Sequence, residues 1–361
     1  MTNGYVHSSV DKVYYNGSYS IGANWTVWDG KVKQNTLKLN KLTARQAELD
    51  SAVTANSIQE QIAQLYVQIL YSAEAIEVNK QSLATSRKNA ERGEEMLKVG
   101  KMSKADMSQL TAQVAKDEYN VVEAESNLRR YKLQLKQLLE ITDDQTFDVA
   151  IPTTTDQQAL AEIPALNDVY ASALASRPEI EGSKLGIASA DVSKDIARAG
   201  RMPQVGLTAS VGTNTTSMSS DAWGKQLKTN FDAGIGVTVS VTIFDNRKTK
   251  TAVRKAQLQR ETSMLELKDK QKQLYSTIEG YWIDAVTNQN KFRSAKVSVE
   301  SEQQSYDLLS EQFRLGLKNI VELMTGKTNL LTAQQNELQS KYMAILNQQM
   351  LRFYKGEGLS M

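Results

Sequence analysis

Few side chains in this sequence are of the types that carry out catalysis or bind metal ions. The 361 residues include one histidine, His7, and no cysteine, whereas catalytic triads and zinc sites depend on such residues. His7 has no recognisable partner nearby, so we interpret it as an incidental surface residue. No glycine-rich loop that could cradle a phosphate is visible either. The sequence therefore predicts no enzyme, no metal site and no cofactor.

The residues with the best claim to a functional role are two acids, Asp106 and Glu322, which lie 216 positions apart. Each follows a potential helix cap, Ser103 or Asn319, by three residues. At this spacing the cap and the acid each satisfy a free N–H group at the start of a helix. Capping alone would explain both acids, but it is compatible with a second, functional role.

A glycine stands just before each cap, Gly100 in one copy and Gly316 in the other, again 216 residues apart. Glycine readily takes the left-handed conformation that ends a helix. One helix should therefore end at each glycine, and the next should open at the cap. This arrangement places Asp106 and Glu322 at the tips of two tight helical hairpins.

Two long helices lead to these tips. Apolar residues recur every seven positions before each glycine, which predicts helices packed along their length by heptads. About 65 residues of helix form a rod on the order of 100 Å, too long to be the core of a compact domain. The returning helices are expected over 103–140 and 319–354. The heptad positions of the two rods are Ile62, Ile69, Ile76, Leu83, Ala90 and Leu97, and then Ile278, Ala285, Phe292, Val299, Tyr306 and Phe313.

Strands are expected before both rods. Residues 18–28, 204–212 and 231–243 alternate apolar with small or polar side chains, and this period of two is typical of strands. A hairpin on a soluble core and a transmembrane barrel hairpin both fit the alternation. The context favours the barrel, because strands that lead directly into rods have no globular core to cover. Trp25 and Trp28, at a strand end, are expected to anchor the strand at the membrane interface.

Asp29 and Asp245 follow these strands at the positions expected for the N-caps of the rods. The polar stretch 213–230 is expected to be a loop. Upstream of residue 204, a helix is expected over 166–199, with a break at Arg177-Pro178.

Composition limits the remaining classes of protein. The chain is 40% hydrophobic and 23% charged, and no run approaches the roughly 20 apolar residues of a membrane helix. Any membrane contact must therefore come by another route. The 43 basic and 41 acidic residues nearly cancel, so we interpret them as solvated helix faces and expect no nucleic-acid partner.

The repeat defines the expected domains: a first repeat over 1–140, a linker over 141–165 and a second repeat over 166–361. The first repeat would hold a truncated β-hairpin, a long helix and a returning helix, and the second would hold a helix, a β-hairpin, a long helix and a returning helix. At the 216-residue offset, the counterparts of Arg177 and Pro203 would precede Met1. We therefore expect the sequence to be a fragment that lacks an export signal, a first helix and most of a first strand.

Three strings of the chain, over 175–207, 236–259 and 315–338, resemble the TolC-like outer membrane efflux proteins. The resemblance implies a mainly α-helical homotrimer in which each chain gives four strands to one twelve-stranded barrel in the outer membrane. The helices would continue as a tube through the periplasm. Such a protein is the passive exit duct of a tripartite efflux pump or type I secretion system. Its partners would be a periplasmic adaptor, an inner membrane pump and outer membrane lipid.

The same resemblance implies a gate at the hairpin tips. Glu322 falls on a pore-lining acid, Lys318 on a basic residue that ties one hairpin to the next, and Phe313 on an aromatic residue of the same lock. Asp106 falls on the acid of the other repeat. We expect Lys318 to bridge to Asp106 of a neighbouring hairpin.

Two other functions are compatible with long helices. A non-membrane coiled-coil scaffold could use the rods to bridge partner proteins, and it would be almost wholly helical. A periplasmic adaptor also uses helical hairpins, but it would need a lipoyl-like β domain that is not recognisable in this sequence.

Overall fold

The computed structural model describes residues 14–142, 147–152 and 154–359, so His7 lies outside the described residues. The chain divides into two compact units, and each draws on both predicted repeats. The first unit joins Met1–Gln46 to Lys184–Glu266, and the second joins Ala47–Ser183 to Leu267–Met361.

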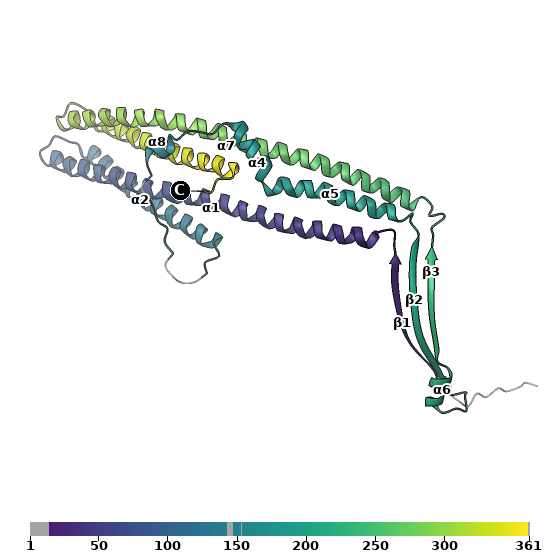
Figure 1. Ribbon diagram of the computed structural model, residues 1–361. Helices are drawn as coiled ribbons and strands as arrows, with labels where there is room; N and C mark the ends of the chain where they lie inside the picture. The colour runs from purple at the N-terminus through teal and green to yellow at the C-terminus, as the bar shows by residue number, and fades with distance from the viewer. Residues whose placement is uncertain (1–13, 143–146, 153, 360–361) are drawn as a thin grey trace, which may run out of the picture. The chain divides into compact units, whose positions relative to one another are not determined.

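A three-stranded antiparallel sheet dominates the first unit (Figure 1). Its strands are β1 (Asn16–Trp28), β2 (Gln204–Thr216) and β3 (Asp232–Ser240), with β2 in the centre. Trp28 pairs with Val205, and Gln204 pairs with Ser240. The ends of the sheet from which the long helices continue are therefore level with one another.

Both faces of this sheet are exposed. In the two edge strands every residue is exposed except Gly17 in β1 and Gly236 in β3, and in the central strand only Thr215 is buried. Large apolar side chains stand out from the surface, with Ile21 77% and Ile235 82% exposed. The described residues therefore give no support to the interpretation of the strands as a hairpin on a soluble core.

The strand ends differ from the prediction by more than two residues in two places. The third strand stops at Ser240 rather than at residue 243, because its last partner is Gln204 and the preceding Pro203 has no N–H to donate. The second strand runs on to Thr216, because these additional residues pair with the start of β1.

A short helix, α6 (Trp223–Thr229), interrupts the segment that was predicted to be a loop. The buried side chain of Gln226 holds it against the sheet. Its Oε1 accepts a hydrogen bond from the N–H of Thr216 at 2.7 Å, and its Nε2 donates to the carbonyl of Asp221 at 2.7 Å. A seven-residue helix has too little periodicity to be recognised in a sequence.

The two long helices, α1 (Val32–Lys98) and α7 (Lys248–Arg314), are each 67 residues long, as the heptads predict. Asp29 and Asp245 are not their cap residues. Each helix begins three residues later, after a pair of residues with positive φ, Gly30–Lys31 or Asn246–Arg247. The carboxylates still help to close the turn: Asp29 accepts from the N–H of Lys33 at 3.0 Å, and Asp245 accepts from that of Thr249 at 2.8 Å.

The returning helices are α2 (Lys104–Leu138) and α8 (Ile320–Lys355), close to the predicted bounds. The predicted linker contains a one-turn helix, α3 (Asp156–Ala159), opened by a capping box of Thr155 and Gln158. The next helix is broken before proline, as expected, into α4 (Leu166–Ser176) and α5 (Pro178–Ala199).

Arg177, at this break, is only 6% exposed. Its guanidinium lies 4.4 Å from the ring centre of Phe353 and 3.9 Å from that of Tyr354. These cation–π contacts attach the break to the end of α8. The surrounding core of the second unit contains Val169, Ala173, Ile278 and Leu351.

Each hairpin contains one very close contact between its two helices, and the two contacts are reversed. In the first hairpin a Cβ on Gly93 of α1 would collide with Leu110 of α2. In the second hairpin a Cβ on Gly326 of α8 would lie 2.6 Å from Leu309 of α7. Gly93 corresponds to Leu309 at the 216-residue offset, and Leu110 corresponds to Gly326. The large and the small residue have thus exchanged helices while the packing is retained.

Candidate functional site

The two hairpin tips have the same backbone design. Gly100 and Gly316 are left-handed, with φ of 73° and 77°. In the second hairpin the N–H of Gly316 donates to the carbonyl of Phe313 at 3.0 Å, and that of Leu317 donates to Gln312 at 2.9 Å. The first hairpin repeats this pair of bonds. Both long helices thus end in the glycine-dependent stop that the sequence predicts.

The cap of α8 is a complete capping box. Asn319 Oδ1 accepts from the N–H of Glu322 at 2.9 Å, and Glu322 Oε2 accepts from the N–H of Asn319 at 3.2 Å. The cap of α2 is only half of this arrangement. Ser103 Oγ accepts from the N–H of Asp106 at 3.0 Å and donates to its carboxylate at 2.7 Å. The capping-box role is therefore confirmed for Glu322, whereas the carboxylate of Asp106 accepts from the Ser103 hydroxyl instead of the Ser103 N–H.

Lys318 is paired within its own hairpin. Its Nζ lies 2.5 Å from Oε1 of Glu322, and both side chains are 38% exposed. This hydrogen bond, together with the one from the Asn319 N–H, holds the pKa of Glu322 below its ordinary value. In this chain the lysine therefore bonds Glu322 rather than Asp106, and the bridge to a neighbouring hairpin stays a prediction.

Phe313 is a core residue of the tip region and is only 6% exposed. It belongs to a cluster that joins the two hairpins, with Leu110 from α2 and Leu323 from α8. Methionines surround this cluster, and their flexible side chains repack easily. The methionines are Met96, Met102, Met107 and Met324.

A buried polar network links the hairpins beyond the tips, and sequence reasoning missed it. Lys327 of α8 is bonded to both Asp117 of α2 and Ser86 of α1. Ser86 Oγ also donates to Asp117 at 2.5 Å, and Gln113 Nε2 donates to Asp117 at 3.0 Å. The side chains of Asp117 and Lys327 are 1% and 8% exposed, so the interpretation of all charges as solvated faces is wrong here.

A signal for this network was present in the heptads. Asp117 stands seven residues after the buried Leu110, and Lys327 stands seven residues after the buried Ile320. Opposite charges at two heptad positions that face the helix contact indicate a buried ion pair, because neither charge could be buried without the other.

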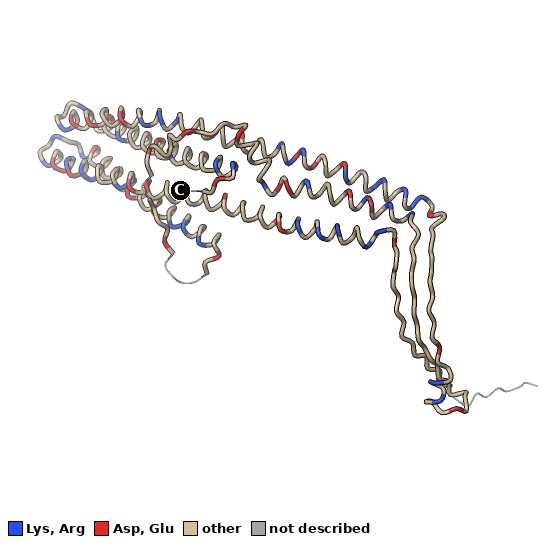
Figure 2. The backbone as a smooth tube through the Cα atoms, viewed as in Figure 1, with Lys and Arg blue, Asp and Glu red and all other residues tan. Residues whose placement is uncertain are grey.

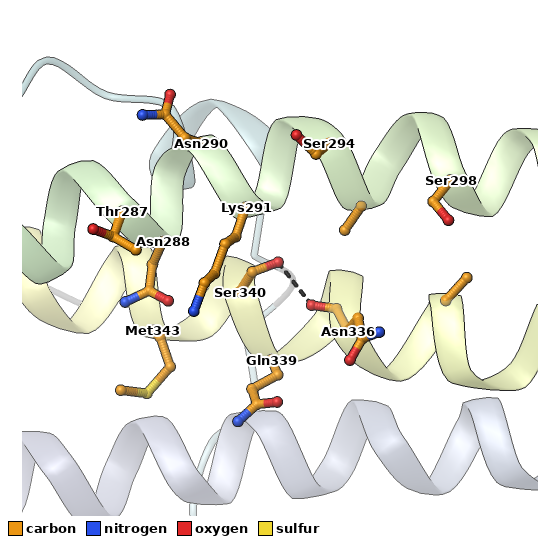
Figure 3. A pocket seen from close by; sticks show the side chains of 12 residues that line it. Thr287, Asn288, Asn290, Lys291, Ser294, Ser298, Asn336, Gln339, Ser340 and Met343 are labelled. Atoms are coloured by element: carbon orange, nitrogen blue, oxygen red, sulfur yellow. Dashed lines mark hydrogen bonds between the residues drawn. The ribbon is translucent and has the colours of Figure 1, made fainter.

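An open groove of about 880 Å³ lies between α7 and α8 (Figure 3). Lys291 is its only charged lining residue, and most of the others are Ser, Thr, Asn or Gln. The Ser340 hydroxyl donates to the carbonyl of Asn336 at 2.7 Å. The groove thus lacks an acid–base pair or a nucleophile with a base beside it, which argues against catalysis there.

No group of three His, Cys, Asp or Glu side chains that could hold a metal ion occurs in the described part of the chain. None of its described helices combines the length and the apolar composition needed to cross a membrane. Trp25 and Trp28, predicted to be interface anchors, are 65% and 40% exposed on β1. Their contact with a membrane stays a prediction.

Comparison with known proteins gives a consistent result. Residues 169–357 match the family described as "Outer membrane efflux protein". The chain is 24% identical over 183 residues to "Outer membrane protein TolC" of Escherichia coli strain K12, across 47% of this chain and 37% of that protein. It is 20% identical over 320 residues to "Outer membrane efflux protein BepC" of Brucella suis, across 88% of this chain and 67% of that protein. The chain thus spans little more than a third of TolC in that match.

Among solved structures, that of CusC superposes on 96% of this chain and 84% of its own, with a TM-score of 0.82 and 14% identity. At this identity the likeness concerns the fold alone, and the fold agrees with the family match. The matched family segment covers more than half of the 361 residues. The chain therefore belongs to the outer membrane efflux protein family.

Proposed function

We propose that this chain is a subunit of a trimeric outer membrane duct, passive and without a cofactor, for efflux or secretion. The observation that carries the proposal is the sheet. One of its faces is apolar and exposed, and β1 and β3 lead into 67-residue helices within eight residues. A soluble scaffold would have to bury such side chains, whereas lipid accepts them on the outer face of a barrel.

Closure of the barrel supports the trimer. A three-stranded sheet has two open edges, and the hydrocarbon region does not tolerate unpaired backbone groups. Four strands from each of three chains, as the resemblance implies, would close a barrel of twelve. This proposal replaces the coiled-coil scaffold, which the family match does not favour.

The gate is proposed at the hairpin tips. Glu322 and Lys318 stand together at one tip and Asp106 at the other. Three copies around one axis would form a ring of charge, which selects ions by sign. The lysine's present partner is in its own hairpin, so opening and closing would exchange Glu322 for Asp106 of a neighbouring hairpin.

The energy for transport would come from partners, because the sequence shows no phosphate-cradling glycine loop and no cysteine. An inner membrane pump and a periplasmic adaptor are the proposed partners. The relatives' names include efflux for BepC and alkaline protease secretion for AprF of Pseudomonas aeruginosa. Small molecules and polypeptides both remain candidate cargo.

The test is fractionation of cells that express the native gene, followed by electrophoresis with and without heating. We expect the protein in the outer membrane fraction, migrating as a trimer until it is boiled, with circular dichroism of mixed strand and helix. A protein that fractionates with soluble material and gives a purely helical spectrum would refute the duct and restore the scaffold.

A further inference from the structure

In the first unit, the two segments that open the long helices are rich in Lys and Arg and contain no acids. Residues 31–46, which open α1, contain five Lys or Arg, and residues 246–260, which open α7, contain six. Neither segment contains Asp or Glu. We call the cations of these two segments the basic collar. Figure 2 shows blue positions gathered where the long helices meet the strands.

Most of the collar has no internal partner. Arg260 pairs with Asp191 at 2.7 Å, and Lys33 donates to the carbonyl of Thr26 at 3.2 Å. Eight other collar residues are exposed, and none forms an ion pair with a carboxylate in the described residues: Lys31, Lys38 and Lys41, then Arg247, Lys248, Lys250, Arg254 and Lys255. Their charge is therefore available to a partner.

The collar also opposes the helices that carry it. Helix N-termini favour acids, because the macrodipole is positive there. The helices α2, α4, α5 and α8 each have an acid in the first turn, whereas α1 and α7 have none. The cations recur across the repeat, since Lys31 corresponds to Arg247 and Lys38 to Arg254. One Asp precedes each helix, Asp29 or Asp245, but the cations outnumber it at both helix starts, and this repeated excess indicates a negatively charged partner.

The position of the collar identifies the chemistry of this partner. The apolar sheet ends at Trp28 in β1 and at Ser240 in β3, and the collar begins within seven residues of each. Along β1 the side chains change from exposed apolar residues to tryptophan and then to unpaired cations, and after β3 the exposed Ile243 and Phe244 precede the cations. This order matches a bilayer from its hydrocarbon to its headgroups.

We infer that the basic collar binds the phosphate groups of anionic phospholipids in the membrane leaflet next to the helices. This inference rests on the proposed membrane function. Each cation near an anionic surface strengthens binding by roughly fivefold. The collar would hold the barrel at a fixed depth and enrich anionic lipid around it.

The test uses native protein in vesicles of phosphatidylcholine containing brominated phosphatidylglycerol or brominated phosphatidylcholine. Trp25 and Trp28 lie at the collar end of the sheet and report on bromine nearby, in a background where Trp223 and Trp282 are replaced by Phe. We expect the brominated anionic lipid to quench the tryptophan fluorescence at about tenfold lower mole fraction than brominated phosphatidylcholine at low salt. This preference for the anionic lipid should fade at molar salt.

A collar variant, Lys38→Gln, Lys41→Gln, Arg254→Gln and Lys255→Gln, should lose most of the preference. A control removes the same charge from exposed positions of the second unit, with Lys88→Gln, Arg129→Gln, Lys268→Gln and Lys272→Gln, and should keep it. Equal quenching by both lipids in the parent, or an unchanged preference in the collar variant, would overturn the inference. So would loss of the preference on adding inorganic phosphate at constant ionic strength, since the collar would then be a free-anion site.

Failure here is separable from failure of the proposed function. Conductance of the native protein in pure phosphatidylcholine tests the duct without anionic lipid. A conducting protein with no lipid preference would overturn the collar alone, and a protein that fails to insert would overturn both.

Discussion

The returning helices α2 and α8 are equivalent in the 216-residue repeat, yet their surroundings differ. Eighteen residues of α8 are buried against four of α2. The repeat pair Val122 and Leu338 shows the difference directly: Val122 is 61% exposed, and Leu338 is 5% exposed against Val67 and Leu70 of α1. One chain thus completes the packing of α8 but leaves the equivalent face of α2 open, as expected if a neighbouring chain covers it in the proposed trimer.

The largest effect should come from the buried network, whose charged residues Lys327 and Asp117 correspond in the repeat to the uncharged Thr111 and Ala333. Lys327→Met leaves Asp117 buried without its counter-charge, and losing one partner of a buried pair typically costs about 3–5 kcal/mol. We expect this decrease in the free energy of unfolding of the helical part, measured by urea titration and circular dichroism.

The repeat supplies the matched control. Thr111 is the counterpart of Lys327 and is exposed, so Thr111→Met should change stability by less than about 0.5 kcal/mol. The double variant Lys327→Met, Asp117→Leu should recover most of the loss, because no buried charge remains. Near-parental stability of Lys327→Met would mean that the pair is not buried in solution.

The pair Val122 and Leu338 tests the comparison next. Leu338→Ala should lower stability by about 2–5 kcal/mol, because it leaves a cavity against α1. Val122→Ala should leave the fold of the chain intact, since Val122 is exposed, and should weaken the trimer instead. Sedimentation in detergent separates the two effects. If Val122→Ala destabilised the dissociated chain as much as Leu338→Ala does, the asymmetry would be refuted.

Much of this asymmetry lay beyond sequence reasoning. The heptads and the stop glycines predicted both long helices and both tips, because these signals are local and occur twice. The burial of Lys327 and Asp117 was missed because the overall charge balance suggested that all charges were on the surface, although the heptad positions of both residues carried the signal. Similarly, the alternation at residues 241–243 predicted a longer third strand than the structure has. The length of a strand depends on the strand that pairs with it, and β2 begins at Gln204, directly after Pro203.

The reversed contact near the tips gives a smaller effect. Gly326→Leu alone should lower stability by about 1–3 kcal/mol, because it overpacks the contact with Leu309. Adding Leu309→Gly recreates the arrangement of the first hairpin, Gly93 beneath Leu110, and should restore much of the loss. Thermal melting of the three proteins measures this. If the two substitutions destabilised the protein additively, the glycine and the leucine could not exchange helices, and the proposed equivalence of the two contacts would be wrong.

The smallest effect on stability concerns Glu322. Its pKa in the folded protein is lowered by Lys318, so its contribution is present above the ordinary pKa of 4.5 and is lost as the pH falls through the folded value. Glu322→Gln keeps a side chain that can complete the capping box, and it should remove this dependence below about pH 4.5 while α8 stays folded. Hydrogen exchange at the first turn of α8 across this pH range gives the readout, and an unchanged pH profile would contradict the pairing.

Single-channel recording in planar bilayers tests the duct and its gate most directly. The native protein should conduct poorly and prefer cations, because three copies of Glu322 would meet at one narrow site. Glu322→Gln should reduce the preference for cations, and Lys318→Ala should raise the conductance at low salt, where exposed charges are least screened. A silent bilayer would contradict the duct, and an open channel that neither substitution alters would place the gate away from the hairpin tips.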